Sequence, residues 1–312
     1  MNKGIIFHDI IDAVERLRGV ANRTPVLTSR VLNELSRQQV YLKCENFQRG
    51  GAFKFRGAYN ALSKLSEEER KRGVIAFSSG NHAQGLALAC KILDVQATIV
   101  MPDDAPESKV EAVQSYGGNV LFFDRYKESR EMIASQYSEE HGMAIIPPFD
   151  HPDIIAGAGT AAYELMQEHP FLEHLVTPVG GGGLISGTAL AAKGMNPRVK
   201  IHGVEPEGAD DVRRSMLLGE RVRIDPPDTI ADGLRTQQVG ERNFPIIQQM
   251  VHEVVTVSEE EIEVAMRFAM VRLKIVIEPS SAVALAAIMF RKFQIEKGSC
   301  IGVILSGGNV EL

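Results

Sequence analysis

Residues 175–187 read Leu-Val-Thr-Pro-Val-Gly-Gly-Gly-Gly-Leu-Ile-Ser-Gly. The apolar start predicts a buried strand over Leu175–Val179, and the Ala- and Leu-rich residues after the glycines predict a helix. A turn between a strand and a helix needs one or two glycines, whereas this one has four: Gly180, Gly181, Gly182 and Gly183. Residues without Cβ let several backbone N–H groups converge on one anion at the start of a helix. The stretch therefore predicts an α/β fold with a phosphate site.

The same alternation of short apolar strands and helical patterns extends over most of the chain. The predicted strands are Val40–Cys44, Val74–Phe77, Ala97–Met101, Val120–Phe123, Leu175–Val179, Ile201–Val204, Val254–Val257 and Ile301–Leu305. Strand and helix in repeated order predict parallel sheets that are covered on both faces. The block 73–149 holds three strand–helix units of its own. We expect it to form a small domain inserted into a larger one, which comprises 1–72 and 150–312.

The glycine run does not fit the known nucleotide fingerprints. It offers no G-x-G-x-x-G register, and no Lys-Ser/Thr pair of the Walker type follows it. A nicotinamide dehydrogenase is therefore disfavoured, and a single phosphate monoester is the better interpretation.

Two more loops follow predicted strands, where ligands bind in such sheets. Residues 77–84 read Phe-Ser-Ser-Gly-Asn-His-Ala-Gln, so that Ser78, Ser79, Asn81 and His82 crowd the start of a helix. Hydroxyls, an amide and free N–H groups there suit a carboxylate, although a well-capped helix explains them too. The loop at Ser306 is, by itself, an ordinary glycine turn.

Lys54 stands between two aromatic residues in Gly-Gly-Ala-Phe-Lys-Phe-Arg-Gly, near a predicted helix start. Apolar surroundings would lower the pKa of its amine and make it nucleophilic. A surface lysine at a helix N-terminus is the plainer alternative. Acidic residues crowd 205–211, which suits either a hard cation or a solvated loop.

Composition excludes several classes of function. With 34 Lys and Arg against 40 Asp and Glu, the net charge of −6 and the absence of a basic cluster disfavour a nucleic-acid partner. No apolar run approaches the roughly 18 residues of a membrane span, and no signal-peptide pattern opens the chain. Three scattered cysteines without a CxxC pair fit reduced thiols. We expect a cytoplasmic protein without a membrane or nucleic-acid partner.

Taken together and in this order, the five loops resemble the fold-type-II pyridoxal-phosphate enzymes. The Ser-Ser-Gly-Asn-His-Ala loop and the Ala-Phe-Lys-Phe-Arg-Gly segment are most similar to the serine/threonine dehydratase and serine racemase family. The resemblance covers nearly the whole chain, and it implies the two-domain architecture typical of tryptophan synthase β, with the cofactor between the domains. It also implies a homodimer.

The resemblance assigns roles residue by residue. It implies that Lys54 carries pyridoxal 5′-phosphate through an imine, that Gly180 to Gly183 bind the phosphate, and that Phe53 packs near the ring. Asn81 would meet the ring hydroxyl and Ser306 the pyridine nitrogen. Ser78, Ser79 and His82 would lie in the substrate-carboxylate loop. Glu205, Ala209 (through its carbonyl) and Asp211 match a divalent-cation site, with Mg²⁺ expected. Ala52 departs from the family, which usually has serine there.

The implied reaction is dehydration and deamination of a β-hydroxy amino acid to a 2-oxo acid and ammonia. Serine, threonine and 3-hydroxyaspartate are all possible substrates. Lys54 would take the Cα proton, and Ser79 would make serine racemisation possible from the opposite face. Arg130, Arg235 and Thr236 are candidates for a second substrate carboxylate, although a solvated ion pair explains either arginine. The alternatives are a β-replacement lyase of the cysteine-synthase type and a non-catalytic binding protein.

Overall fold

The computed structural model describes residues 4–310 and contains two sheets. The larger sheet has the strand order β1-β2-β10-β7-β8-β9, and all its pairs are parallel except β1–β2. Its strands are β1 (Val26–Leu27), β2 (Gln39–Cys44), β7 (His174–Pro178), β8 (Lys200–Pro206), β9 (Glu253–Val257) and β10 (Cys300–Leu305).

Helices cover both faces of this sheet because its strands are apolar on both sides. Successive residues of β7 show this, since Leu175 belongs to one core cluster and Val176 to the other. The first face is covered by α1 (Phe7–Leu17), α8 (Pro152–Glu168), α9 (Gly183–Met195), α10 (Asp211–Leu218) and α11 (Asn243–Met250). The second is covered by α2 (Arg30–Ser36), α12 (Glu259–Phe268) and α13 (Pro279–Met289).

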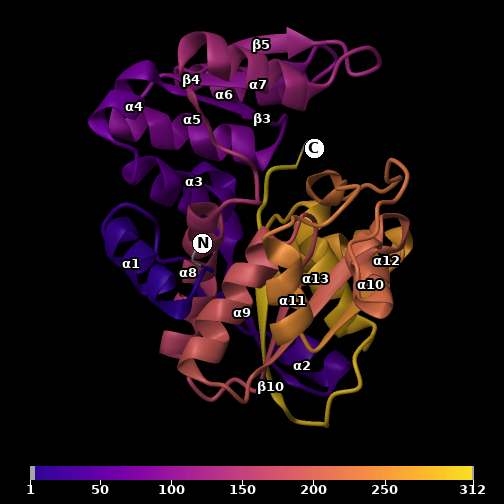
Figure 1. Ribbon diagram of the computed structural model, residues 1–312. Helices are drawn as coiled ribbons and strands as arrows, with labels where there is room; N and C mark the ends of the chain where they lie inside the picture. The colour runs from indigo at the N-terminus through magenta and orange to yellow at the C-terminus, as the bar shows by residue number, and fades with distance from the viewer. Residues whose placement is uncertain (1–3, 311–312) are drawn as a thin grey trace.

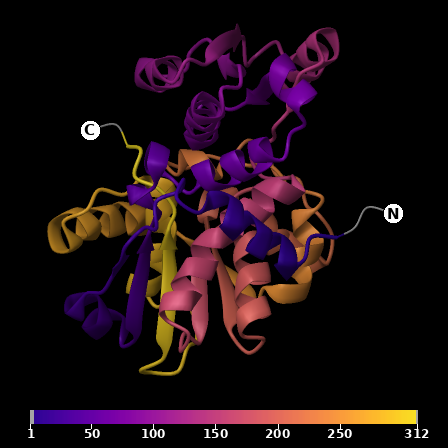
Figure 2. The ribbon, with the colours of Figure 1, turned by 90° about the vertical axis from the view of Figure 1, so that its left-hand side faces the viewer.

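The smaller sheet is wholly parallel, in the order β5-β4-β3-β6. It comprises β3 (Val74–Phe77), β4 (Ala97–Pro102), β5 (Asn119–Phe123) and β6 (Ala144–Ile145). The helices before and around it are α3 (Lys54–Ser63), α4 (Glu67–Arg72), α5 (Asn81–Leu93), α6 (Glu107–Ser115) and α7 (Arg130–His141). Figures 1 and 2 show this sheet and its helices as a separate upper part of the molecule, with α3 at the junction. The predicted α/β class with parallel sheets is confirmed.

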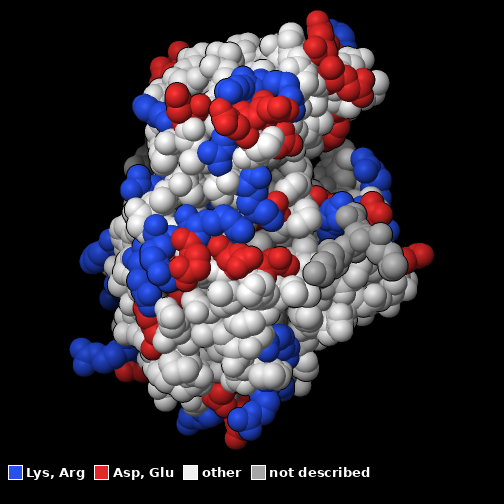
Figure 3. Space-filling view, turned by 60° about the vertical axis from the view of Figure 1, so that its left-hand side comes forward, with Lys and Arg blue, Asp and Glu red and all other residues white. Residues whose placement is uncertain are grey.

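Short helical turns complete the connections. They are η1 (Glu45–Phe47), η2 (Arg49–Gly51), η3 (Glu207–Ala209), η4 (Asp232–Leu234) and the π-helical turn η5 (Ala269–Leu273). No helix within residues 4–310 combines the length and apolar character that crossing a membrane requires. On the face drawn in Figure 3, basic and acidic side chains are interspersed.

Two buried histidines join β7 to β8. His202 lies 2.8 Å from His174 (Nε2 to Nδ1) and 3.1 Å from the Glu253 carboxylate (Nδ1 to Oε1). Burial lowers the pKa of His202 to about 3, and the neighbouring His174 adds to the effect. The imidazole is therefore neutral in the folded chain at physiological pH.

This histidine makes a specific prediction for stability. Below pH 6.5 the unfolded chain binds a proton at residue 202 that the folded chain does not. The free energy of unfolding therefore decreases as the pH is lowered from 6.5 to about 3. We expect His202→Gln to reduce the slope of unfolding free energy against pH by up to about 1.4 kcal/mol per pH unit near pH 5. Urea denaturation at several pH values measures this slope. The exposed His8→Gln is the control, and an unchanged slope in His202→Gln would contradict the prediction.

Candidate active site

The glycine loop joins β7 to α9, and its backbone donors are free. Gly182 adopts φ +95°, which favours glycine, and a Cβ at Gly181 would overlap the ring of Phe149. Gly181, Gly182 and Gly183 are buried. In the described part of the chain, no N–H group of Gly180–Gly183 donates a hydrogen bond to another residue. Buried donors without partners are rare, and at a helix N-terminus they suit a phosphate.

Lys54 is the first residue of α3. Its Nζ donates a 2.7 Å hydrogen bond to the Pro148 carbonyl and lies 5.2 Å from the centre of the Phe53 ring. Burial lowers the pKa of the amine to about 8, while the nearby Glu278 carboxylate opposes the shift. The amine therefore loses its proton much more readily near neutral pH than an ordinary lysine does, as a nucleophile or base requires.

The segment Pro148–Phe149 links the lysine to the glycine loop. Pro148 accepts the hydrogen bond from Lys54, and the next residue packs its ring against Gly181. The predicted phosphate cradle and the predicted reactive amine therefore lie on either side of one dipeptide. Both fit a phosphorylated aldehyde cofactor that is anchored at two ends.

Ser306 lies at the end of β10, next to the lysine segment. It is 4% exposed, and its carbonyl accepts a 2.9 Å hydrogen bond from the Phe53 backbone N–H. Ala52 and Gly307 form an isolated antiparallel bridge at the same place. The order of the strands in the large sheet thus brings the C-terminal glycine turn beside Lys54.

The substrate loop predicted between β3 and α5 approaches Lys54 from the smaller sheet. A Cβ at Gly85 would lie 3.2 Å from the Lys54 carbonyl carbon, so α5 packs directly on the start of α3. Ser78 Oγ accepts a 3.3 Å hydrogen bond from the Gly80 N–H, and Ser79 is half-buried. Within residues 4–310, the first three N–H groups of α5 have no partner. They can bind a carboxylate.

His82 is a buried, neutral member of this loop. Its Nε2 lies 2.9 Å from the Ile146 carbonyl, which accepts only, so that this nitrogen carries the proton. Burial, together with the charge of Lys54, lowers the pKa of His82 to about 3. Nδ1 is buried and has no partner among the described residues. It can accept a hydrogen bond but brings no positive charge to a carboxylate.

Glu278 is a site residue that the sequence analysis missed. Asn81 donates from Nδ2 to Glu278 Oε1 over 2.7 Å and accepts at Oδ1 from Asn309 Nδ2 over 2.9 Å. Glu278 is 3% exposed, and burial raises the pKa of its carboxyl to about 7 despite the hydrogen bond from Asn81. The one signal in the sequence that could have identified Glu278 is its position as a single carboxylate directly after the apolar run 275–277.

The candidates for a second carboxylate come from the start of α7, which holds Arg130, and from the loop after η4, which holds Arg235 and Thr236. Arg130 stands 5.7 Å over the ring of Phe77, which leads into the substrate loop, and its ion pair with Glu131 is half-exposed. Thr236 Oγ1 is buried and has no partner in the described chain. Arg235 donates from two nitrogens to the Thr229 carbonyl, so two of its five N–H donors serve the local fold.

Glu205 on β8 and Asp211 at the start of α10 are fully buried carboxylates. Burial and the charge of Asp211 raise the pKa of Glu205 well above its usual range, and burial raises the pKa of Asp211 to about 7. Glu205 accepts from the N–H groups of Val212 and Arg213, whereas both oxygens of Asp211 lack partners among residues 4–310. Within residues 4–310, no group of three or more His, Cys, Asp or Glu side chains is arranged to hold a metal ion. The orphaned oxygens fit a hard cation that also uses carbonyls, such as that of Ala209, and water.

Comparison with known proteins agrees with this geometry. The chain is 52% identical over 306 residues to L-threo-3-hydroxyaspartate ammonia-lyase from a Pseudomonas species, which covers 98% of this chain and 96% of that protein. It is 50% identical to serine racemase from Schizosaccharomyces pombe, over 98% of this chain and 94% of that protein. Serine racemase from Dictyostelium discoideum has a similar crystal structure, with a TM-score of 0.94, 46% identity and 99% of both chains covered.

A family model described as pyridoxal-phosphate-dependent enzyme matches residues 17–307. This match spans both sheets, the glycine loop and Lys54, and it confirms the resemblance read from the sequence. The chain belongs to the family of pyridoxal-phosphate-dependent enzymes.

Proposed function

We propose that this enzyme converts a small β-hydroxy amino acid to a 2-oxo acid and ammonia, with L-threo-3-hydroxyaspartate and L-serine as the first substrates to test, and that it also racemises serine. The names of its relatives support both activities. The observation that carries the proposal is the pairing of an amine of lowered pKa, Lys54, with a loop of buried free N–H groups.

Pyridoxal phosphate, when bound, supplies the electron sink for breaking a bond at the substrate Cα. The protein positions the groups around it. The N–H groups of Gly180–Gly183 hold the phosphate, and those at the start of α5 hold the substrate carboxylate. Lys54 removes the Cα proton, the β-hydroxyl leaves as water, and hydrolysis of the remaining enamine yields a 2-oxo acid and ammonia.

The direct test is a purified-protein assay. We expect a visible absorption band when pyridoxal phosphate is added, and 2-oxo acid formation from L-threo-3-hydroxyaspartate and L-serine. L-threonine and D-serine complete the substrate panel. A protein that gains no visible band with added cofactor, or that forms no 2-oxo acid from any of the four, would overturn the proposal.

We further propose that Glu205, Ala209 and Asp211 hold Mg²⁺. The orphaned oxygens of Asp211 and the raised pKa values of both carboxylates support this, because a cation would stabilise their charged forms. Binding must displace protons from these groups, so affinity should increase as the pH rises through about 7.

Chelation tests the cation site. We expect EDTA to lower the melting temperature and Mg²⁺ to restore it, since a ligand at 100 times its Kd stabilises the fold by about 2.7 kcal/mol. Asp211→Asn should abolish this response. Glu207→Gln, an exposed change in the same loop, should leave it intact. Equal melting temperatures with EDTA and with Mg²⁺ in the wild-type protein would contradict the assignment.

Arg130 is proposed to bind the second carboxylate of hydroxyaspartate. Its position over Phe77, directly before the substrate loop, supports this role, and Thr236 could donate its unpaired hydroxyl to the same group. We expect Arg130→Gln to raise KM for L-threo-3-hydroxyaspartate about tenfold, because a hydrogen bond to a charged group contributes roughly 1.5–3 kcal/mol. KM for L-serine should change little. Steady-state kinetics with both substrates measure the difference, and equal changes would exclude this role.

We also infer a homodimer. Apolar side chains on and after η5 are strongly exposed, with Met270 at 53%, Val271 at 48% and Val276 at 43%. Exposed apolar side chains in one short segment favour association with a second copy. Light scattering during size-exclusion chromatography tests this, and a monomeric mass at micromolar concentration would refute it.

A further inference from the structure

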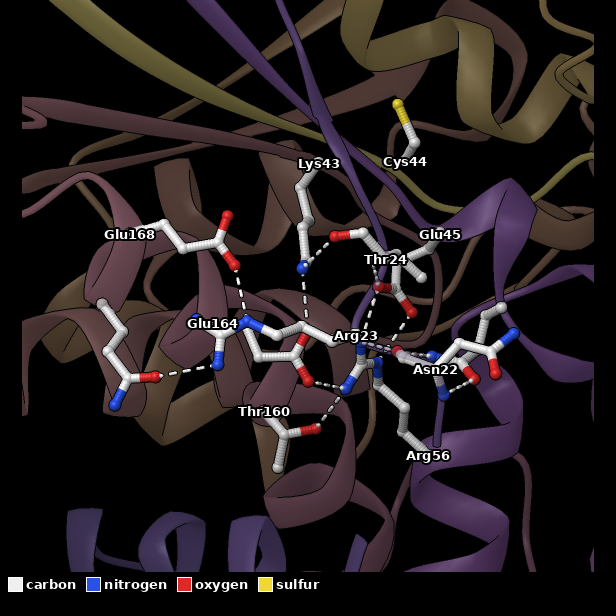
Figure 4. Close-up of polar contacts among 12 residues, drawn as sticks. Asn22, Arg23, Thr24, Lys43, Cys44, Glu45, Arg56, Thr160, Glu164 and Glu168 are labelled. Atoms are coloured by element: carbon white, nitrogen blue, oxygen red, sulfur yellow. Dashed lines mark hydrogen bonds and ion pairs between the residues drawn. The ribbon is translucent and has the colours of Figure 1, made fainter. Parts of the chain in front are cut away.

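Four charged side chains are buried together behind the start of α3 (Figure 4). Lys43, Glu45 and Arg56 are 0% exposed, and the Glu164 side chain is 15% exposed. They come from β2, η1, α3 and α8, and α8 lies about a hundred residues after the other three elements. Two cations and two carboxylates make the cluster electrically neutral as a whole.

Arg56 is the centre of this cluster. Its Nε and Nη2 donate to Glu45 over 2.7 and 2.8 Å, and its Nη1 and Nη2 donate to Glu164 over 2.7 and 2.9 Å. The guanidinium also donates to Thr160 Oγ1 and to the Asn22 carbonyl. Burial would lower the pKa of Arg56, but the two carboxylates outweigh burial and raise it. Two bidentate pairs fix both the position and the plane of the side chain.

Lys43 is the second cation of the cluster and pairs with the same Glu164 carboxylate as Arg56. Its Nζ lies 2.7 Å from Glu164 Oε2 and donates over 2.8 Å to the Thr24 carbonyl. Thr24 in turn donates its hydroxyl to Glu45 Oε1 over 2.6 Å. Lys43 therefore satisfies the same carboxylate as Arg56 but makes no contact of this kind with α3.

The position of Arg56 on α3 connects the cluster to Lys54. Two residues of an α-helix are roughly 200° apart around its axis, so the two side chains leave the first turn on opposite sides. On the Arg56 side, α3 meets α8 backbone to backbone. A Cβ at Gly57 would lie 2.9 Å from the Ile154 carbonyl oxygen, and a Cβ at Gly157 would lie 2.5 Å from that of Arg56.

We propose that Arg56 is a positioning residue, whose paired carboxylates hold the first turn of α3 against η1 and α8 and so determine where the Lys54 amine meets the cofactor. This inference rests on the proposed function, in which Lys54 bonds to pyridoxal phosphate. The physical reason is that a misplacement of about 1 Å at a reacting group can reduce rates about 10²-fold. Arginine is required because lysine cannot make two bidentate pairs at once.

The test compares the rate at which the apoprotein acquires its visible band with pyridoxal phosphate, as a function of pH. In Arg56→Lys we expect this rate to fall at least tenfold and its pH midpoint to shift. The double variant Arg56→Gln with Glu45→Gln keeps the cluster neutral, so it separates charge from position. It should recover stability to urea relative to Arg56→Gln alone but remain at least tenfold slower than the wild type.

Lys43→Met is the matched control, because it removes a buried cation from the same cluster but leaves the ion pairs of Arg56 with Glu45 and Glu164 in place. It should lose stability but keep the rate within about twofold of wild type. A wild-type rate and pH midpoint in the double variant, or an equal slowing in Lys43→Met, would overturn the inference. If the wild-type protein itself gains no band, the proposed function fails first, so the two failures are distinguishable.

Discussion

Replacing Lys54 with arginine is expected to reduce 2-oxo acid formation by about 10³-fold, the middle of the range that a general base contributes. Arginine preserves the positive charge near Glu278, but its guanidinium does not lose its proton at physiological pH. It can neither bond covalently to the cofactor aldehyde nor take the Cα proton. The visible band should disappear as well, because it depends on the bond between Lys54 and the cofactor.

Lys64→Arg provides the control for this change. Lys64 follows the same helix, pairs with Asp153 and is 42% exposed, so its replacement by arginine should preserve both band and activity. Circular dichroism and urea denaturation establish that both variants are folded. Activity of Lys54→Arg within tenfold of wild type would show that another group acts as the base.

The strands were predictable because their signal is local. All eight predicted strands occur, with ends shifted by no more than two residues, since runs of β-branched apolar residues bounded by loops are the strongest pattern for a buried parallel strand. The two strands that were missed, β1 and β6, contain two residues each. They pair only because tertiary structure places them at sheet edges, and two residues carry no periodicity.

The candidate site was predictable where it depends on loops that follow strands, and not where it depends on tertiary packing. The glycine run could be picked out by its own sequence, whereas Lys54 was assigned its role only through the family resemblance, since a surface lysine also explains its stretch. Pro148 and Glu278 stand in ordinary stretches, and their contacts with Lys54 and Asn81 join residues 94 and 197 positions apart. A sequence pattern cannot encode such a contact, except through a family resemblance.

Buried charge was the least predictable feature. Lysine and arginine are almost never fully buried unless they are paired, so Lys43 and Arg56 would be expected at the surface. They are 0% exposed because Glu45 in η1 and Glu164 in α8 form ion pairs with them. The partners decide the burial, and the sequence alone does not identify the partners.

The second large effect is expected for Ser79→Ala. Ser79 enters from the loop before α5, whereas Lys54 enters from the start of α3, so the two can serve opposite faces of a bound substrate. Racemisation needs a proton removed on one face and returned on the other, while elimination from L-serine needs only the base on the lysine face. We expect Ser79→Ala to reduce racemisation and D-serine deamination at least 10²-fold, and L-serine deamination by less than tenfold.

Ser78→Ala is the matched control for this division of labour, because it removes a hydroxyl one residue away in the same loop. Ser78 accepts the Gly80 N–H, so its loss should disturb the loop and raise KM for both enantiomers alike. A merely structural role for Ser79 would produce that same parallel change. Chiral chromatography of serine, run beside the 2-oxo acid assay, separates the two cases. A larger loss of racemisation than of L-serine deamination identifies Ser79 as the proton donor on the second face. An equal loss of both activities would refute that role.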